Sequence, residues 1–288
     1  MLDLIGTVAT TAAIAVCLVA ITATPFSQLA QRLALAAVAG AWIGFAAAVA
    51  GAGGLANPAA IPILFITPIA TVVALASFSP AVRALLLAMP MPVLVGLNAI
   101  RILGAFFLVL AAAGRLGGPF PQSAGWGDII TGIFAIPLAS AAAGGSPNHR
   151  RLIGAWNVFG MLDLIVAVTL GTVSANGSPL QIIHAGAGSD AVYSLPCSLI
   201  PTVLVPFFLI VHGIVFAQLR AHVTKDVHGS SGSPARLLRQ EASARGSIRH
   251  ARCSAPGSSS GRVAMVSCWK RAMSMRRCRD PTPRWRGT

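Results

Sequence analysis

The sequence predicts an all-α, polytopic transmembrane helix bundle of about seven helices, followed by a disordered basic C-terminal tail. Two observations carry this prediction. First, 55% of the 288 residues are hydrophobic and only 10% are charged, whereas soluble domains carry roughly 25% charged residues. Second, 14 of the 21 Lys and Arg residues lie at or beyond Lys225, where they face three acidic residues. Residues 1–224 and 225–288 are therefore two different regions, with net charges of +3 and +11.

The first region contains seven apolar runs long enough to span a bilayer. A hydrocarbon core of about 30 Å requires about 20 helical residues, and such segments satisfy their backbone polar groups in lipid only as helices. The predicted spans are residues 4–21, 33–51, 59–78, 92–113, 127–143, 152–173 and 198–219. The first is predicted to be a retained helix rather than a signal peptide, because Asp3 stands where a signal peptide carries positive charge.

Basic residues between the spans favour one orientation. The loops after spans two, four and six carry a single basic residue, Arg115, and the segment after span seven begins with Arg220. The loops after spans one, three and five carry Arg32, Arg83, Arg150 and Arg151. Because basic residues gather in cytoplasmic loops, we expect a multi-pass protein of the cell (inner) membrane with its N-terminus outside and its C-terminus in the cytoplasm.

Small residues follow one face of the second span at intervals of four, and Gly40 and Gly44 are at its centre. Such a groove lets another helix backbone approach closely. The pattern fits packing within the bundle, the favoured interpretation because such motifs are common in polytopic proteins, or a homodimer interface. The residues 79–89, which carry Arg83 among leucines and alanines, are predicted to form a short helix at the inner surface before Pro90 and Pro92.

Ionisable residues inside two spans identify a candidate polar site. Arg101 is in the middle of the fourth span and Asp163 in the middle of the sixth. An ionisable group at bilayer depth is costly, so it normally faces the bundle interior and has a partner. Both spans run from inside to outside, and the two groups are therefore expected to pair. Their predicted polar neighbours are Asn98, Asn157 and His212.

Two further residues are expected at the outer interface. Trp126 and Asp128 lie where the fifth span is predicted to begin at residue 127. Tryptophan prefers the membrane interface, and an acid in the first turn favours the positive end of the helix dipole. An anchored and capped helix start explains both residues.

No metal site, cofactor or catalytic cluster is predicted. The five cysteines form no CxxC pair, catalytic zinc requires three protein ligands, and no nucleophile elbow, HExxH or phosphate-binding loop is present. An enzyme is therefore unsupported. The tail from residue 225 lacks apolar periodicity and is predicted to be disordered. Its charges are compatible with anionic lipid or with nonspecific nucleic-acid contact, and its composition also fits out-of-frame translation of GC-rich DNA, the favoured interpretation.

Three motifs carry a resemblance to known proteins. They are Arg101-Ile-Leu-Gly104, Gly125-Trp126-Gly127-Asp128 and Trp156-Asn157-x-x-Gly160-x-x-Asp163, and a last span with Pro201, Pro206 and His212 accompanies them. This set resembles uncharacterised multi-pass membrane proteins of bacteria over about residues 90–220. The resemblance implies a small helical inner-membrane protein and brings no activity.

The leading functional hypothesis is binding or movement of a small solute or proton through this polar site. Arg101 would be the fixed cation, Asp163 its switchable partner and His212 a relay. The alternative is a structural or accessory membrane subunit in which Arg101 and Asp163 only lock helix packing. The expected partners are the lipid bilayer and a solute or proton, with no specific nucleic acid.

Overall fold

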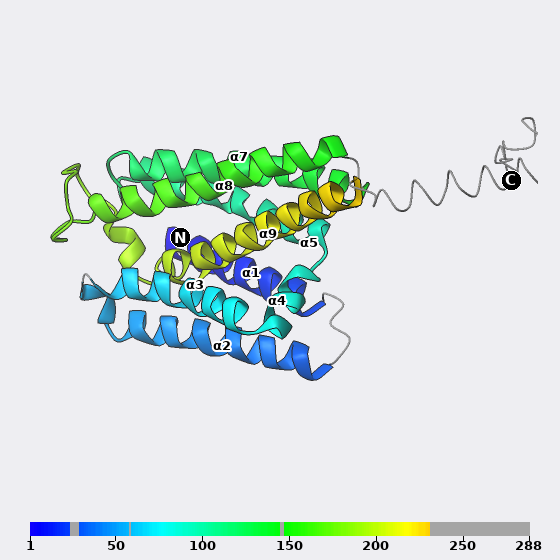
Figure 1. The fold of residues 1–288 in the computed structure, drawn as a ribbon. Coiled ribbons are helices and arrows are strands. Elements are labelled where there is room, and N and C mark those ends of the chain that lie inside the picture. Colours follow the sequence, from blue (N-terminus) through cyan, green and yellow to red (C-terminus); the bar gives the residue numbers. More distant parts are fainter. Residues whose placement is uncertain (24–28, 58, 145–146, 231–288) are drawn as a thin grey trace, which may run out of the picture. The chain divides into compact units, whose positions relative to one another are not determined.

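The predicted all-α fold class is confirmed. The computed structural model describes residues 1–23, 29–57, 59–144 and 147–230, and these ranges contain no strand. Seven helices within them are long and apolar enough to cross a membrane, and successive spans alternate in direction (Figure 1). The protein is therefore a multi-pass membrane protein. The disordered tail was predicted from residue 225, but the last helix extends to Ser230. Residues 231–288 of the predicted tail lie outside the described ranges.

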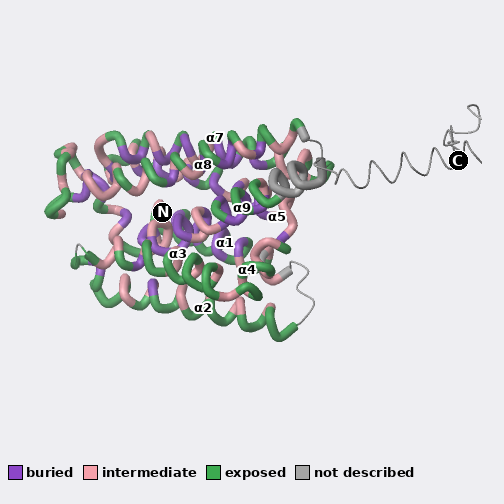
Figure 2. The backbone as a smooth tube through the Cα atoms, in the orientation of Figure 1, coloured by how far each residue is buried: buried purple, intermediate pink, exposed green. Residues whose placement is uncertain are grey.

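The first three spans differ in position: the second and third lie on the outside of the bundle, whereas the first contributes Ala13, Ile14 and Cys17 to the core. They are α1 (Leu2–Ala23), α2 (Leu29–Gly51) and α3 (Ala60–Phe78), with the short η1 (Gly54–Ala56) between the last two. Only 6% of the residues in the spans of α2 and α3 are buried, and both helices are largely exposed in Figure 2. Because their exposed residues are mostly apolar, this surface is suited to contact with lipid chains.

A short helix, α4 (Pro80–Leu87), follows α3 as the sequence predicts. The Ser79 hydroxyl accepts a hydrogen bond from the Val82 amide at 3.4 Å, and Pro80 occupies the first turn. Both features are typical of a helix start. The helix therefore turns the chain before the fourth span.

The fourth span is not one continuous α-helix. It consists of α5 (Met91–Leu97), the 3₁₀ segment η2 (Asn98–Gly104) and α6 (Ala105–Ala112). A 3₁₀ helix has three residues per turn, so side chains three apart lie directly in line. Asn98, Arg101 and Gly104 form such a line, and all three are buried. Apolar composition alone did not reveal this change of helix type.

The remaining spans are α7 (Phe120–Ala143), α8 (Pro147–Val173) and the pair formed by the π-helical η4 (Ile200–Leu204) and α9 (Val205–Ser230). The loop between α8 and η4 contains the 3₁₀ turn η3 (Asp190–Tyr193). α7 begins seven residues before the predicted start at residue 127, because Pro121 opens the helix within the first turn, where proline is favoured. Asp128 is therefore in the third turn, and the prediction that it caps the helix start is wrong.

Proline in the last span leaves a backbone carbonyl without its usual helical partner. Pro206 has no N–H, so it cannot donate to the Thr202 carbonyl four residues earlier. The indole Nε1 of Trp42 on α2 donates to that carbonyl oxygen at 3.1 Å. This hydrogen bond connects the outer helix α2 to the central last span.

The small-residue face of α2 points away from the described part of the bundle. Gly40 and Gly44 are exposed, and a Cβ atom on either would meet no atom within 4 Å. Packing of this face within the bundle is therefore not observed. The homodimer interpretation stays a prediction.

Candidate intramembrane polar site

Five side chains from four spans meet in the interior and form what we call the Arg101 network. Its members are Arg101 on η2, Asp128 on α7, Asn157 and Asp163 on α8, and His212 on α9. At a rise of 1.5 Å per residue, Arg101, Asp128, Asp163 and His212 lie about 12 to 18 Å along their helix axes. These distances are measured from the end of the bundle that carries the 174–196 loop. The network is therefore near the middle of the predicted membrane span.

Arg101 is the centre of the network. Its Nε donates to Asp128 Oδ1 at 2.7 Å, and its Nη2 donates to Asp163 Oδ2. Its Nη1 donates to the Gly160 carbonyl oxygen at 3.2 Å and lies 3.2 Å from His212 Nε2. Four of the five guanidinium N–H groups thus have partners. The side chain is only 1% exposed, so this cation is held entirely by protein groups.

The hydrogen bonds around His212 determine its protonation. Asn157 Nδ2 donates to the His212 carbonyl at 3.1 Å, which leaves Asn157 Oδ1 facing His212 Nδ1 at 2.8 Å. An amide oxygen only accepts, so Nδ1 carries the hydrogen. Nε2 faces the guanidinium of Arg101, which only donates, so Nε2 is an acceptor. His212 is therefore a neutral imidazole that holds Arg101 in place.

Three glycines allow the helices to come this close. A Cβ atom on Gly104 would collide with Asp128, and one on Gly127 would collide with Asp163 Oδ1. A Cβ atom on Gly160 would lie 2.6 Å from His212 Cε1. One glycine of each sequence motif is thus explained by the absence of space beside the network. Each permits one helix to approach a polar side chain of another.

Trp156 adds a further contact between α7 and α8. Its indole Nε1 donates to the Thr131 carbonyl at 3.0 Å, and its ring lies 5.3 Å from that of His212, centroid to centroid. Trp156 is buried. It belongs to the packing around the network and fixes the ring of His212 from one side.

Four of the five residues predicted for the polar site come together, and Asn98 does not. Arg101, Asp163, Asn157 and His212 are brought together, whereas Asn98 is fully buried but donates to its own helix, from Nδ2 to the Leu94 carbonyl at 3.0 Å. Its Oδ1 atom has no hydrogen-bond partner within the described part of the chain.

The two residues predicted for the outer interface, Trp126 and Asp128, also lie in different environments. Trp126 is 56% exposed and lies outside the network, whereas Asp128 is a member of it. Sequence patterns do not reveal the role of Asp128, because the glycines and prolines in residues 114–126 favour a loop before it. The signal that would have found it is Pro121, which favours a helix start well before Asp128.

Comparison with known proteins gives the family. The model of a family described as a domain of unknown function (DUF8737) matches residues 58–220, more than half of the chain. The matched region includes every member of the Arg101 network and excludes α1 and α2. No curated protein and no solved structure matches the chain. The chain belongs to this family of unknown function.

Proposed function

We propose that the protein binds and moves a small solute or proton that carries one positive charge through the Arg101 network. One observation carries this proposal: two carboxylates, Asp128 and Asp163, share one guanidinium. With a neutral His212, the charges of the network sum to −1. The arrangement therefore has a place for one more positive charge.

The membrane setting makes this imbalance consequential. A buried charge without a partner is costly, and ionisable groups inside spans commonly mark paths for ions or protons. A bound proton or monocation would bring the network to neutrality, and its release would restore the net negative charge. Arg101 remains charged throughout, so the exchange takes place on the carboxylates. Asp163 is the proposed switchable group, because it faces both Arg101 and the backbone of Gly127.

His212 has a supporting role in this proposal. A relay must accept a proton on one nitrogen and pass it from the other. Both nitrogens of His212 are engaged, Nδ1 as donor to Asn157 and Nε2 as acceptor from Arg101. The geometry favours a positioning role for His212 over the relay role inferred from the sequence.

Flux measurements on reconstituted protein test the proposal. With the full chain in liposomes that enclose a pH-sensitive dye, we expect an imposed proton gradient to collapse faster than in empty liposomes. Asp163→Asn should abolish the protein-dependent flux while the amount of folded, membrane-inserted protein stays at the parent level. The exposed substitution Val166→Ala on the same helix is the matched control. Equal flux in the parent and in Asp163→Asn would overturn the proposal.

A second candidate function rests on how completely Arg101 is held. Its partners come from α7, α8 and α9, so the network locks the broken fourth span to three neighbours. A structural or accessory membrane subunit needs no more than this. It predicts that Asp163→Asn lowers the folded amount and that a partner protein copurifies with the parent.

The finer localisation is part of the proposal. Arg83, Arg151 and the other basic residues of the short loops lie at the end of the helices opposite to Arg115. Asp3 lies beside Arg115, with its Oδ1 2.5 Å from the Arg115 Nη1. By the positive-inside rule, we propose a bacterial inner-membrane protein with its N-terminus outside. Reporter fusions at residue 224 should be active only with a cytoplasmic reporter.

A further inference from the structure

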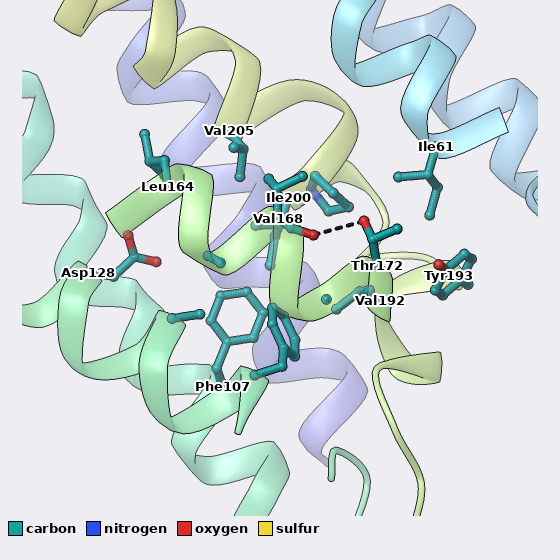
Figure 3. Close-up of a pocket in the computed structure, with 15 residues that line it drawn as sticks. Ile61, Phe107, Asp128, Leu164, Val168, Thr172, Val192, Tyr193, Ile200 and Val205 are labelled. Atoms are coloured by element: carbon teal, nitrogen blue, oxygen red, sulfur yellow. Dashed lines mark hydrogen bonds between the residues drawn. The ribbon is translucent and has the colours of Figure 1, made fainter. Parts of the chain in front are cut away.

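Two apolar cavities meet at Asp128, on the side of the Arg101 network that faces the 174–196 loop. The first has a volume of about 60 Å³ and extends from Asp128 to Thr172 and Tyr193 (Figure 3). The second has a volume of about 50 Å³ and shares Asp128, Phe107 and Leu164 with the first. The network is therefore approached through apolar space from the predicted outer side.

Asp128 is the member of the network that is open to this space. Its side chain is 16% exposed, against 7% for Asp163 and 1% for Arg101. Its Oδ1 accepts from Arg101, but Oδ2 receives no hydrogen bond from any residue in the described ranges. A carboxylate oxygen is thus available at the inner end of the cavity.

The lining of the first cavity selects the chemistry of a ligand. A divalent metal ion requires about six oxygen ligands, and a chain of water molecules requires two to four polar partners for each. The cavity offers few oxygen ligands for a metal ion and few polar partners for water. The Thr172 hydroxyl, one of its few polar groups, already donates to the Val168 carbonyl at 2.8 Å. At the far end, burial raises the pKa of Tyr193 above its ordinary value, so its phenol stays neutral.

Aromatic rings complete the lining. Phe107 and Phe120 pack edge to face, 5.4 Å apart between centroids, and both line the cavity; Phe107 is labelled in Figure 3. Aromatic faces attract organic cations, and a single carboxylate supplies one opposite charge. Apolar walls, aromatic rings and one free carboxylate oxygen together suit a small organic ammonium ion.

We propose that this cavity binds a short alkylammonium ion, whose nitrogen contacts Asp128 Oδ2 and whose alkyl group lies against Phe107 and Val168. A dry cavity of about 150 Å³ accommodates benzene, so about 60 Å³ suits an ion of two or three non-hydrogen atoms. The ion would supply the one positive charge that the network lacks. This inference rests on the proposed function and names its substrate class.

Equilibrium binding of radiolabelled methylammonium to the full chain in lipid nanodiscs tests the inference. We expect saturable binding that ethylammonium displaces and that tert-butylammonium, sodium and methanol do not. Asp128→Asn should weaken binding by about tenfold or more, the effect of losing one charge-assisted hydrogen bond. Asp128→Asn leaves Arg101 paired with Asp163, so the variant is expected to fold.

A matched pair of substitutions on α8 separates the cavity from general effects of size. Val168 lines the cavity, whereas Val166 is 43% exposed on the outer face. Val168→Phe should abolish methylammonium binding and Val166→Phe should leave it unchanged. Equal binding by the two variants, or displacement by sodium or methanol, would overturn the inference.

The failure of this inference is distinguishable from failure of the proposed function. If the parent binds no methylammonium but still collapses a proton gradient in an Asp163-dependent manner, the ligand class is wrong and the proposed function stands. If Asp163→Asn retains full flux, the proposed function fails, and the inference fails with it.

Discussion

The helices α2 and α9 are both apolar spans of similar length and mean hydropathy, yet they occupy opposite positions in the bundle. Only 6% of the α2 span is buried, whereas 56% of the last span is. Their polar residues account for the difference. α9 carries His212, which is held by Asn157 and Arg101 in the interior, whereas the described part of α2 contributes a single indole hydrogen bond to the last span. Of these two helices, the one that carries a member of the Arg101 network is the more buried.

The largest expected effect comes from removing the cation of the central region. Arg101→Gln leaves two buried carboxylates facing each other, and removing one partner of a buried ion pair costs about 3–5 kcal/mol. Asp163→Asn instead brings the network to neutrality, and its amide oxygen can still accept from Arg101. We therefore expect a severe loss of folded protein for Arg101→Gln and little loss for Asp163→Asn, measured as folded, membrane-inserted protein.

The double variant sharpens this test. Arg101→Gln with Asp163→Asn retains one unpaired carboxylate, Asp128, so only partial recovery is expected. Full recovery in the double variant would mean that the unpaired Asp128 carboxylate does not lower the amount of folded protein. The net charge of −1 assigned to the network would then be wrong.

The next largest effect is expected from a glycine in the interior, Gly127, compared with a glycine on the exposed helix α2, Gly44. Gly127→Ala places a methyl group on the Asp163 carboxylate, and overpacking of this kind costs about 1–3 kcal/mol. Gly44→Ala on α2 adds the same methyl group in open space and is the matched control. Thermal unfolding in detergent should separate the two variants. Equal melting temperatures would contradict the close approach of α7 and α8.

Two tryptophans test how the outer region is attached. Trp42→Phe removes the indole donor from the Thr202 carbonyl, which Pro206 cannot replace, and losing the partner of a buried group costs about 1–3 kcal/mol. Trp156→Phe removes a second hydrogen bond from the Thr131 carbonyl, which keeps its helical partner, so the loss should be about 1 kcal/mol. We expect the outer-helix variant to be the more destabilised, as measured by chemical denaturation of the purified protein. The reverse order would indicate that α2 adds little to stability.

The small-residue face of α2 tests association rather than folding. Gly40→Leu with Gly44→Leu should leave the unfolding temperature unchanged, because both positions face open space. If the face forms a homodimer, as the sequence suggests, the double variant should run as a monomer where the parent runs as a dimer. Crosslinking in native membranes gives the answer, and a parent that is already monomeric would end the dimer hypothesis.

The smallest effect concerns the ion pair at the surface. Asp3 and Arg115 have side chains that are 71% and 39% exposed, and exposed pairs contribute little because solvent screens them. Asp3→Asn and Arg115→Gln should therefore unfold at the parent temperature within experimental scatter. A clear fall in unfolding temperature for either variant would show that this ion pair holds α1 in place despite its exposure to solvent.

Much of the fold followed from composition and spacing. Uninterrupted apolar runs near 20 residues predict spans because the bilayer excludes unpaired backbone groups. The predicted start of α7 at residue 127 is seven residues too late. The glycines and prolines before it favour a loop, but Pro121 is compatible with a first helical turn. The 3₁₀ segment at Asn98 was missed because helix type depends on what the side chains meet on the neighbouring span.

A seven-span helical membrane protein, with Arg101 and Asp163 as interior charges in need of partners, was predictable from the residues alone. Charge and apolar length are properties of each segment, so they can be read without knowing the neighbours. The folded arrangement was needed to show that Asp128 shares the same guanidinium, that Asn98 does not join the network, and that glycines make room for it. These facts depend on which helix faces come into contact, and that is set by packing among all the spans together.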